Sequence, residues 1–315
     1  MSTPELHMCV NRTQHYVVGA QAAFLSGTYR YDAAATRWRH WGADDTTITG
    51  LVIDPRDPAV VVTSAQNGMW RSQDRGASWR IMNSWRFTDA RGLALDPSRP
   101  DEVYLALPDG IGHSPDGGRT WTRREDGLPV RGRYTQAVAV DRDRPGFAFA
   151  ACESGLYATR DAGRRWWLRV PTRATTTAVV QDALVRERWF ATTEQDGLWR
   201  SDDAGERWRQ VSLPGPTSTL YDVTTAEVHR GLVAVVDHDH GLWLSEDGGE
   251  RWRQSRPDLP GPVRAHRVGV EPRSGALFLA TYGSGLHTST DLGLSWEHGG
   301  MAGSEVRAFV IGVSA

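Results

Sequence analysis

Residues 72–79 read Ser-Gln-Asp-Arg-Gly-Ala-Ser-Trp, and the pattern Ser/Thr-x-Asp-x-Gly-x-x-Trp that they define decides the fold. The intact pattern occurs six times in the 315 residues, with its aspartates 42 to 45 residues apart, at Asp74, Asp116, Asp161, Asp203, Asp247 and Asp291. A seventh, degenerate copy precedes them. Gly27 to Trp38 aligns without gaps on Gly68 to Trp79, with Ala33 and Ala35 at the Asp and Gly positions.

The residue types in this pattern predict a tight turn that is covered by the indole ring of the Trp. Asp, Ser and Thr side chains bond backbone groups a few residues further on, and Gly accepts the positive φ that such turns often need. Trp packs a large ring over the turn. We therefore interpret each copy as a structural clamp in a hairpin, and not as a catalytic site.

The rest of each period reads as short strands. In the second period, strands are expected at Ile48 to Asp54, Val60 to Ala65, Met69 to Ser72 and Trp79 to Met82. Four short strands in a period of this length are typical of a propeller blade. The prediction is a single all-β domain over residues 1–315, a seven-bladed β-propeller of four-stranded antiparallel blades at about 13–42, 47–83, 89–124, 134–170, 175–212, 218–255 and 264–299.

The two ends of the chain supply candidate strands for closing the ring. Stepping from Trp296 by the interval that separates each clamp Trp from the next inner strand predicts an inner strand at 305–313. This strand has no blade of its own after it, so we expect it to pair with the first blade. His7 to Arg12 also reads as a strand, and the sequence leaves open which terminus completes the first blade.

Composition excludes several classes of function. All 36 basic residues are Arg, which excludes a Schiff-base lysine and a lysine-containing phosphate loop. Charges of both signs are mixed along the chain, with a net charge of -2, so no nucleic-acid partner is expected. No apolar run approaches the ~20 residues of a spanning helix, so no membrane partner is expected either. The absence of a signal-peptide pattern in residues 1–5 and the presence of only two cysteines favour a cytoplasmic location.

The clamps resemble the Asp-box, or BNR, repeats of sialidase-like propellers, and the resemblance covers nearly the whole chain. That group includes sialidases, xyloglucan-cleaving hydrolases, sortilin-type receptors and a photosystem assembly factor, so the resemblance implies a fold and no single function. Sialidases carry a Phe/Tyr-Arg-Ile-Pro motif that is absent here, and sialidase activity is not expected. The resemblance also implies that the clamps lie on one face and a site on the opposite face. Such a site would be built by the loops before the first strand and after the second strand of each blade.

Polar and aromatic residues fall in those loops. We predict ligand binding by Asp89, Arg91, Gln136, Arg264, Arg307, Trp85 and Tyr282, because Arg forks bind carboxylates, phosphates and sulfates and a Trp can stack on a ring. Acid–base or nucleophilic roles are assigned to Tyr134, His266, Glu153 and Glu194, the last two as a carboxylate pair.

A His-x-His pattern follows a strand at Leu232 to Val236. On an extended strand His238 and His240 point to the same side, and His266 heads the next inner strand. Imidazoles suit a divalent metal such as Zn, Cu or Fe. The alternative is a solvated loop rich in acidic residues and His.

Three functional hypotheses follow. The first is a propeller that binds, and as an enzyme would transform, a small polar or anionic molecule in the central funnel opposite the clamps. The second is a metal-assisted hydrolase, lyase or oxidase that uses the His cluster. The third is a non-catalytic scaffold with a protein partner.

Overall fold

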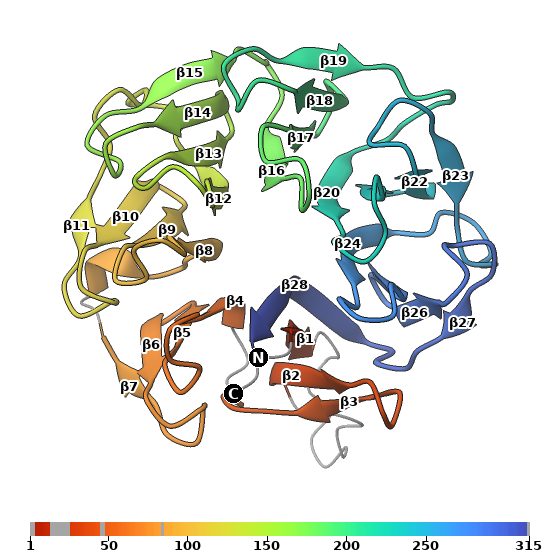
Figure 1. Cartoon of the computed structure of the whole chain (residues 1–315), viewed down its shortest axis with the longest axis horizontal. Helices are drawn as coiled ribbons and strands as arrows, with labels where there is room; N and C mark the ends of the chain where they lie inside the picture. The colour runs from red at the N-terminus through yellow and green to blue at the C-terminus, as the bar shows by residue number, and fades with distance from the viewer. Residues whose placement is uncertain (1–3, 13–25, 45–47, 83–84, 314–315) are drawn as a thin grey trace.

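The computed structural model describes residues 4–12, 26–44, 48–82 and 85–313, and it forms a ring of seven four-stranded antiparallel sheets (Figure 1). This confirms the predicted seven-bladed β-propeller. The blades are numbered here by the order of their clamps. From the innermost strand outward, blade 1 holds β28 (Ser304–Val313), β1 (Pro4–Arg12), β2 (Gly27–Asp32) and β3 (Arg37–His40).

The other blades each use four consecutive strands, which lie from the centre outward in chain order. Blade 2 holds β4 (Ile48–Ile53), β5 (Val61–Ala65), β6 (Gly68–Ser72) and β7 (Arg80–Ile81), and blade 3 holds β8 (Gly92–Leu95), β9 (Val103–Leu107), β10 (Gly110–Ser114) and β11 (Thr122–Arg123). Blade 4 holds β12 (Thr135–Val140), β13 (Ala148–Cys152), β14 (Gly155–Thr159) and β15 (Trp167–Val170). Blade 5 holds β16 (Thr176–Gln181), β17 (Trp189–Thr193), β18 (Leu198–Ser201) and β19 (Arg209–Val211). Blade 6 holds β20 (Leu220–Thr225), β21 (Val233–Asp237), β22 (Gly241–Ser245) and β23 (Arg253–Ser255), and blade 7 holds β24 (Ala265–Val270), β25 (Leu277–Thr281), β26 (Gly285–Ser289) and β27 (Glu297–His298).

The hydrophobic core lies between neighbouring blades. The second strand of each blade lies at the centre of this core. Both faces of β9, β13 and β21 are covered, and every residue of these strands is buried. Their near-continuous apolar sequences follow from that two-sided burial. Outside the strands, one 3₁₀ turn, η1 (Trp85–Phe87), places Phe87 against Trp121. Among the described residues, no helix is long and apolar enough to cross a membrane.

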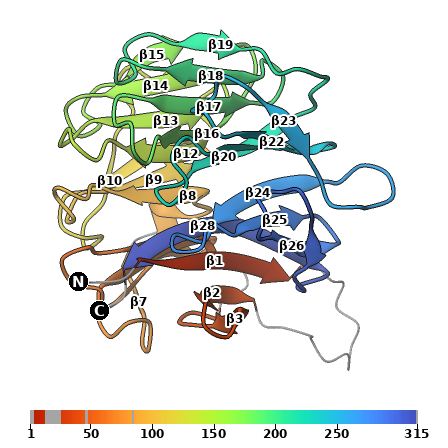
Figure 2. The ribbon, with the colours of Figure 1, turned by 45° about the vertical axis from the view of Figure 1, so that its right-hand side comes forward.

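Both termini build blade 1, so they occupy adjacent strands and do not compete for one. β28 pairs antiparallel with β1 along the whole length of β1, from Pro4 opposite Val313 to Arg12 opposite Ser304 (Figure 2). The predicted blade 13–42 therefore differs from the structure, since its second strand comes from residues 4–12. Residues 13–25 lie outside the described residues.

The clamps form as the sequence predicts. In blade 2, Ser72 Oγ accepts the Gly76 N–H at 2.8 Å, and Asp74 accepts the Ser78 N–H at 2.8 Å. Trp79 Nε1 then donates to the Gly76 carbonyl at 3.1 Å. In the degenerate copy of blade 1, Asp32 accepts the Ala35 N–H at 3.0 Å, and the hairpin closes more tightly.

The clamps lie beside the loops that join the first and second strands, because the Arg75 N–H donates to the Ala59 carbonyl at 3.0 Å. The heads of the inner strands lie at the opposite face.

A β-bulge near the head of the inner strand recurs in the blades. The register shifts by one residue there, which leaves one extra residue on the inner strand: Thr49, Gln136, Thr177, Tyr221, His266 and Arg307. In blade 3 the Arg91 N–H donates to the Ala106 carbonyl, and Ala106 also stands opposite Gly92, so Arg91 takes the same place. Bulges re-aim side chains, and this ring of residues builds the site described next.

Candidate functional site

A cavity of about 200 Å³ lies on the axis of the ring, and all seven inner strands or their leading residues line it. Its volume is below the ~300–1,000 Å³ that drug-sized ligands occupy, so an occupant must be small. The polar part of its wall consists of Thr49, Arg91, Gln136, Thr177, Tyr221, Asp222, Arg267 and Arg307. We call this cavity the central channel.

Three of the seven bulge residues tie neighbouring blades together. Thr49 Oγ1 donates to the Ala90 carbonyl at 2.7 Å, and Thr177 Oγ1 donates to the Leu220 carbonyl at 2.5 Å. His266 Nε2 lies 2.9 Å from the Val306 carbonyl. In each case the acceptor is the residue before the bulge of the next blade. These side chains are interblade staples, and their polar ends are already used.

The other four bulge residues, Arg91, Gln136, Tyr221 and Arg307, line the central channel. Arg91 lies 3.3 Å from the Asp89 carboxylate, and its guanidinium is 5.3 Å from the centre of the Tyr134 ring. Burial raises the pKa of Tyr134, while the positive charge of Arg91 acts in the opposite direction. The structure thus brings together four residues that the sequence analysis assigned to a site: Asp89, Arg91, Tyr134 and Gln136.

Two further ionisable groups of the channel wall escaped the sequence analysis. Asp222 accepts the Val268 N–H at 3.1 Å, and burial raises the pKa of its carboxyl although Arg267 opposes that shift. Arg267 donates from Nε to the Arg307 carbonyl and from Nη1 to the His266 carbonyl, both at 2.8 Å. Both residues directly follow a bulge residue, and in blade 6 the bulge turns two successive side chains, Tyr221 and Asp222, toward the axis. Such a bulge cannot be recognised from the alternation of polar and apolar residues along a strand.

The imidazoles predicted to bind metal are engaged elsewhere. His238 Nδ1 lies 3.0 Å from the Ala265 carbonyl, and His240 Nδ1 lies 2.8 Å from Asp237. Burial lowers the pKa of His266 to about 3, so its ring is neutral, and it stacks on Tyr282 at 4.1 Å. Within the ranges that the structure describes, no group of three or more His, Cys, Asp or Glu side chains is arranged to hold a metal ion. The geometry therefore gives the metal hypothesis no support.

The remaining predicted residues lie around the rim. Tyr282 donates to Glu305 at 3.4 Å, and Glu305 pairs with Arg307 at 2.9 Å, which links Tyr282 to the channel. Arg264 is exposed and holds a positive φ of 56° in the loop before β24. Trp85 begins η1, but its side chain lies outside the described part of the chain.

The predicted carboxylate pair lies on neighbouring loops of blades 4 and 5. The backbone of Glu153 donates to the Tyr134 carbonyl, and that of Glu194 donates to the Thr175 carbonyl, each at 2.9 Å. No described residue forms a hydrogen bond or ion pair with either carboxylate, so nothing orients them toward each other. A glycosidase-type role for the pair stays a prediction.

No family model and no curated protein matches the chain. Solved structures do. The GH74 xyloglucanase from Xanthomonas campestris superposes with a TM-score of 0.65 at 21% identity over 80% of this chain, which spans 45% of that protein. YCF48 from Cyanidioschyzon merolae gives 0.61 at 14% identity, covering 80% of this chain and 84% of its own. YCF48 bound to a D1 peptide gives 0.63 at 15% identity, covering 82% of each chain. At such identities these likenesses establish the propeller fold alone, and the Asp-box resemblance stays a prediction.

Proposed function

We propose that this protein binds a small organic anion of the carboxylate class in the central channel. One observation carries the proposal: the channel wall contains three guanidinium groups, from Arg91, Arg267 and Arg307, and one carboxyl group, from Asp222, while Asp89 and Glu305 pair with Arg91 and Arg307 from outside the wall. Guanidinium groups bind carboxylates through paired hydrogen bonds, and in a narrow, partly desolvated cavity such bonds are stronger than in water.

The rest of the wall limits what else the ligand can carry. Leu51, Leu93, Phe309 and Val310 line the same channel, so apolar side chains share the wall with the charged groups. A ligand with one anionic head and a short apolar portion matches both parts. We therefore expect short-chain carboxylates to bind better than large or highly polar molecules.

The proposal is tested by isothermal titration calorimetry with propionate and butyrate, using the corresponding neutral amides for comparison. The carboxylates should bind and the amides should not. Arg267→Met and Arg91→Met should each weaken carboxylate binding by roughly 10- to 100-fold, because each removes charged hydrogen-bond donors worth about 1.5–3 kcal/mol. Arg264→Met is the matched control, since Arg264 lies outside the channel wall and should leave binding unchanged.

Equal binding of the amides, or unchanged binding in both channel variants, would contradict the proposal. In that case the scaffold hypothesis, with a protein partner on the outer surface, would be favoured.

A further inference from the structure

A second cavity, of about 560 Å³, opens beside the clamps of blades 2 and 3, away from the heads of the inner strands. Its volume lies within the range of small-molecule sites. Arg71, Gln73, Trp79 and Arg80 of blade 2 line it, together with Arg119 from the clamp of blade 3. We call it the interblade groove.

The three arginines of the groove are placed unfavourably for one another. Arg71 and Arg80 stand directly opposite on paired strands, an arrangement that destabilises a sheet when the charges are alike. Burial and the charge of Arg119 both lower the pKa of Arg71, and its Nε is buried without a hydrogen-bond partner.

No described carboxylate lies within ion-pair distance of these three arginines. The aspartates whose charge reaches Arg71 most strongly, Asp54 and Asp101, are held by Arg56 at 2.9 and 3.4 Å. The polar contact of Arg119 is with a backbone oxygen, the Asp116 carbonyl at 2.8 Å. The groove therefore concentrates three positive charges with no carboxylate in direct contact, while Asp54, Asp101 and Asp57 act on Arg71 from a distance.

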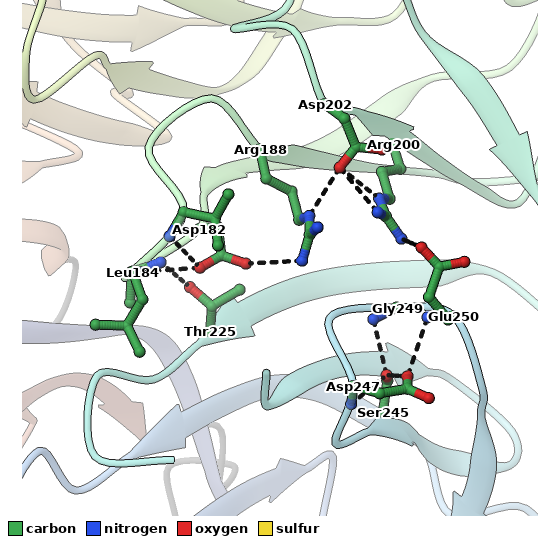
Figure 3. A network of polar contacts seen from close by, with 12 residues as sticks. Asp182, Leu184, Arg188, Arg200, Asp202, Thr225, Ser245, Asp247, Gly249 and Glu250 are labelled. Atoms are coloured by element: carbon green, nitrogen blue, oxygen red, sulfur yellow. Dashed lines mark hydrogen bonds and ion pairs between the residues drawn. The ribbon is translucent and has the colours of Figure 1, made fainter. Parts of the chain in front are cut away.

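The equivalent place between blades 5 and 6 shows how the fold neutralises such a pair. Arg200 and Arg209 again stand opposite each other on paired strands. Asp202 lies 2.8 Å from Arg200, and Glu250 reaches Arg200 from the next blade at 2.6 Å (Figure 3). Arg209 lies 3.9 and 3.7 Å from the same two carboxylates. Arg188 also lies 2.8 Å from Asp202 and 3.8 Å from Asp182, so three arginines are matched there by three acids.

The repeat aligns the two places position by position. Counted from the clamp Ser, Asp202 corresponds to Gln73, and Glu250 corresponds to Arg119. Blades 2 and 3 thus carry an amide at the position of one carboxylate and a third guanidinium at the position of the other. The arginine pair is present in both places, but its two carboxylate partners are present only between blades 5 and 6.

We propose that the interblade groove binds a tetrahedral oxyanion, a phosphate or sulfate group, whose oxygens take the places of the two missing carboxylates. A doubly charged anion fits three guanidiniums better than a single carboxylate does, and guanidinium forks match the geometry of phosphate oxygens. The groove is larger than the anion, and Trp79 forms part of its wall, so a phosphate or sulfate ester of a small molecule can also be accommodated. This site is independent of the central channel.

The test is isothermal titration with inorganic phosphate, inorganic sulfate and phenyl phosphate at low ionic strength. All three should bind, with affinity falling as salt is added. Tighter binding of phenyl phosphate would indicate an ester as the natural ligand, and tighter binding of the inorganic ions would indicate free oxyanion. Arg71→Met and Arg80→Met should each reduce affinity at least about tenfold.

Arg119→Glu is the decisive variant, because it installs the counterpart of Glu250 and so supplies the missing counter-charge. It should abolish oxyanion binding while the melting temperature stays the same or rises, which separates loss of the site from loss of the fold. Arg209→Met, at the neutralised place, should leave binding unchanged.

Arg91→Met separates the groove from the central channel. It should leave oxyanion binding unchanged even though it weakens carboxylate binding in the channel. The proposal is overturned if none of the three anions binds, if Arg119→Glu binds them as the natural protein does, or if Arg91→Met abolishes their binding.

Discussion

Single residues at one position of the repeat divide into two kinds with different roles. Thr49, Thr177 and His266 bond to the backbone of the next blade, although Thr49 and Thr177 also line the channel. Arg91 and Arg307 line the channel and pair with the carboxylates of Asp89 and Glu305. His266 shows why residue type alone is a poor guide. A histidine at the mouth of a funnel suggests catalysis, but this ring is 3% exposed and bonded to a backbone carbonyl.

The neutral state of His266 predicts a pH dependence of stability. Burial lowers its pKa from 6.5 to about 3 in the folded chain. As the pH falls, the imidazole is therefore protonated in the unfolded chain at a higher pH than in the folded chain. Stability should therefore decrease from about pH 6.5 downward, by about 2 kcal/mol between pH 7 and pH 5 from this group. Urea unfolding at both pH values should show this loss of unfolding free energy in the natural protein. The loss should be smaller by about that amount in His266→Gln. An identical loss in both proteins would contradict the lowered pKa of His266.

The recurring element is the clamp hairpin, and the carboxylate of its Asp accepts several of the hydrogen bonds that close it. Hydrogen bonds from Ser78 and Ser72 hold the pKa of Asp74 down at about 2, and similar bonds do the same for Asp291. The clamps thus favour the ionised carboxylate. They hold hairpins on the face away from the channel, so the motif that identifies the fold does not build the channel wall.

A lowered pKa means that the stabilisation by Asp74 is present above the unfolded value near 3.8 and is lost as the pH falls through about 2. Asp74→Asn should therefore lower the urea midpoint at pH 7, and its difference from the natural protein should shrink steadily between pH 4 and pH 2. Ala33→Asn in the degenerate clamp is the matched control and should have little effect at either pH. A difference that persists unchanged at pH 2 would show that the carboxylate charge is not what the clamp uses.

At the scale of the whole molecule, the ring is held by pairing the two ends of the chain. β28 is the inner strand of blade 1 and also packs on blade 7, where Phe309 approaches Gly269 so closely that an added Cβ would lie 2.6 Å from its ring. Arg307 and Phe309, both from β28, line the channel, so closure of the ring and completion of the channel are one event.

Removal of residues 304–315 should therefore abolish both cooperative unfolding and carboxylate binding. Thermal unfolding followed by tryptophan fluorescence should lose its sharp transition in the truncated chain. A circular permutant that joins the natural termini and opens the loop at 171–174 keeps every strand, and it should retain the transition. A truncated chain that melts like the natural protein would show that β28 is dispensable for closure.

The sequence by itself determined the fold to the level of the blade, because the clamp and the strand pattern are local properties that repeat. It also placed Asp89, Arg91, Tyr134 and Gln136 together, because the period of the repeat brings equivalent loops to one face. Only the tertiary structure decided that the two termini fill adjacent strands, since strand pairing over some 300 residues leaves no local signal. The bulge beside His266 turns Arg267 to the axis and His266 to its neighbour, which depends on the next blade's backbone. The unpaired charges of Arg71, Arg80 and Arg119 likewise become visible only when two blades meet, because electrostatic partners are defined by distance in space and not along the chain.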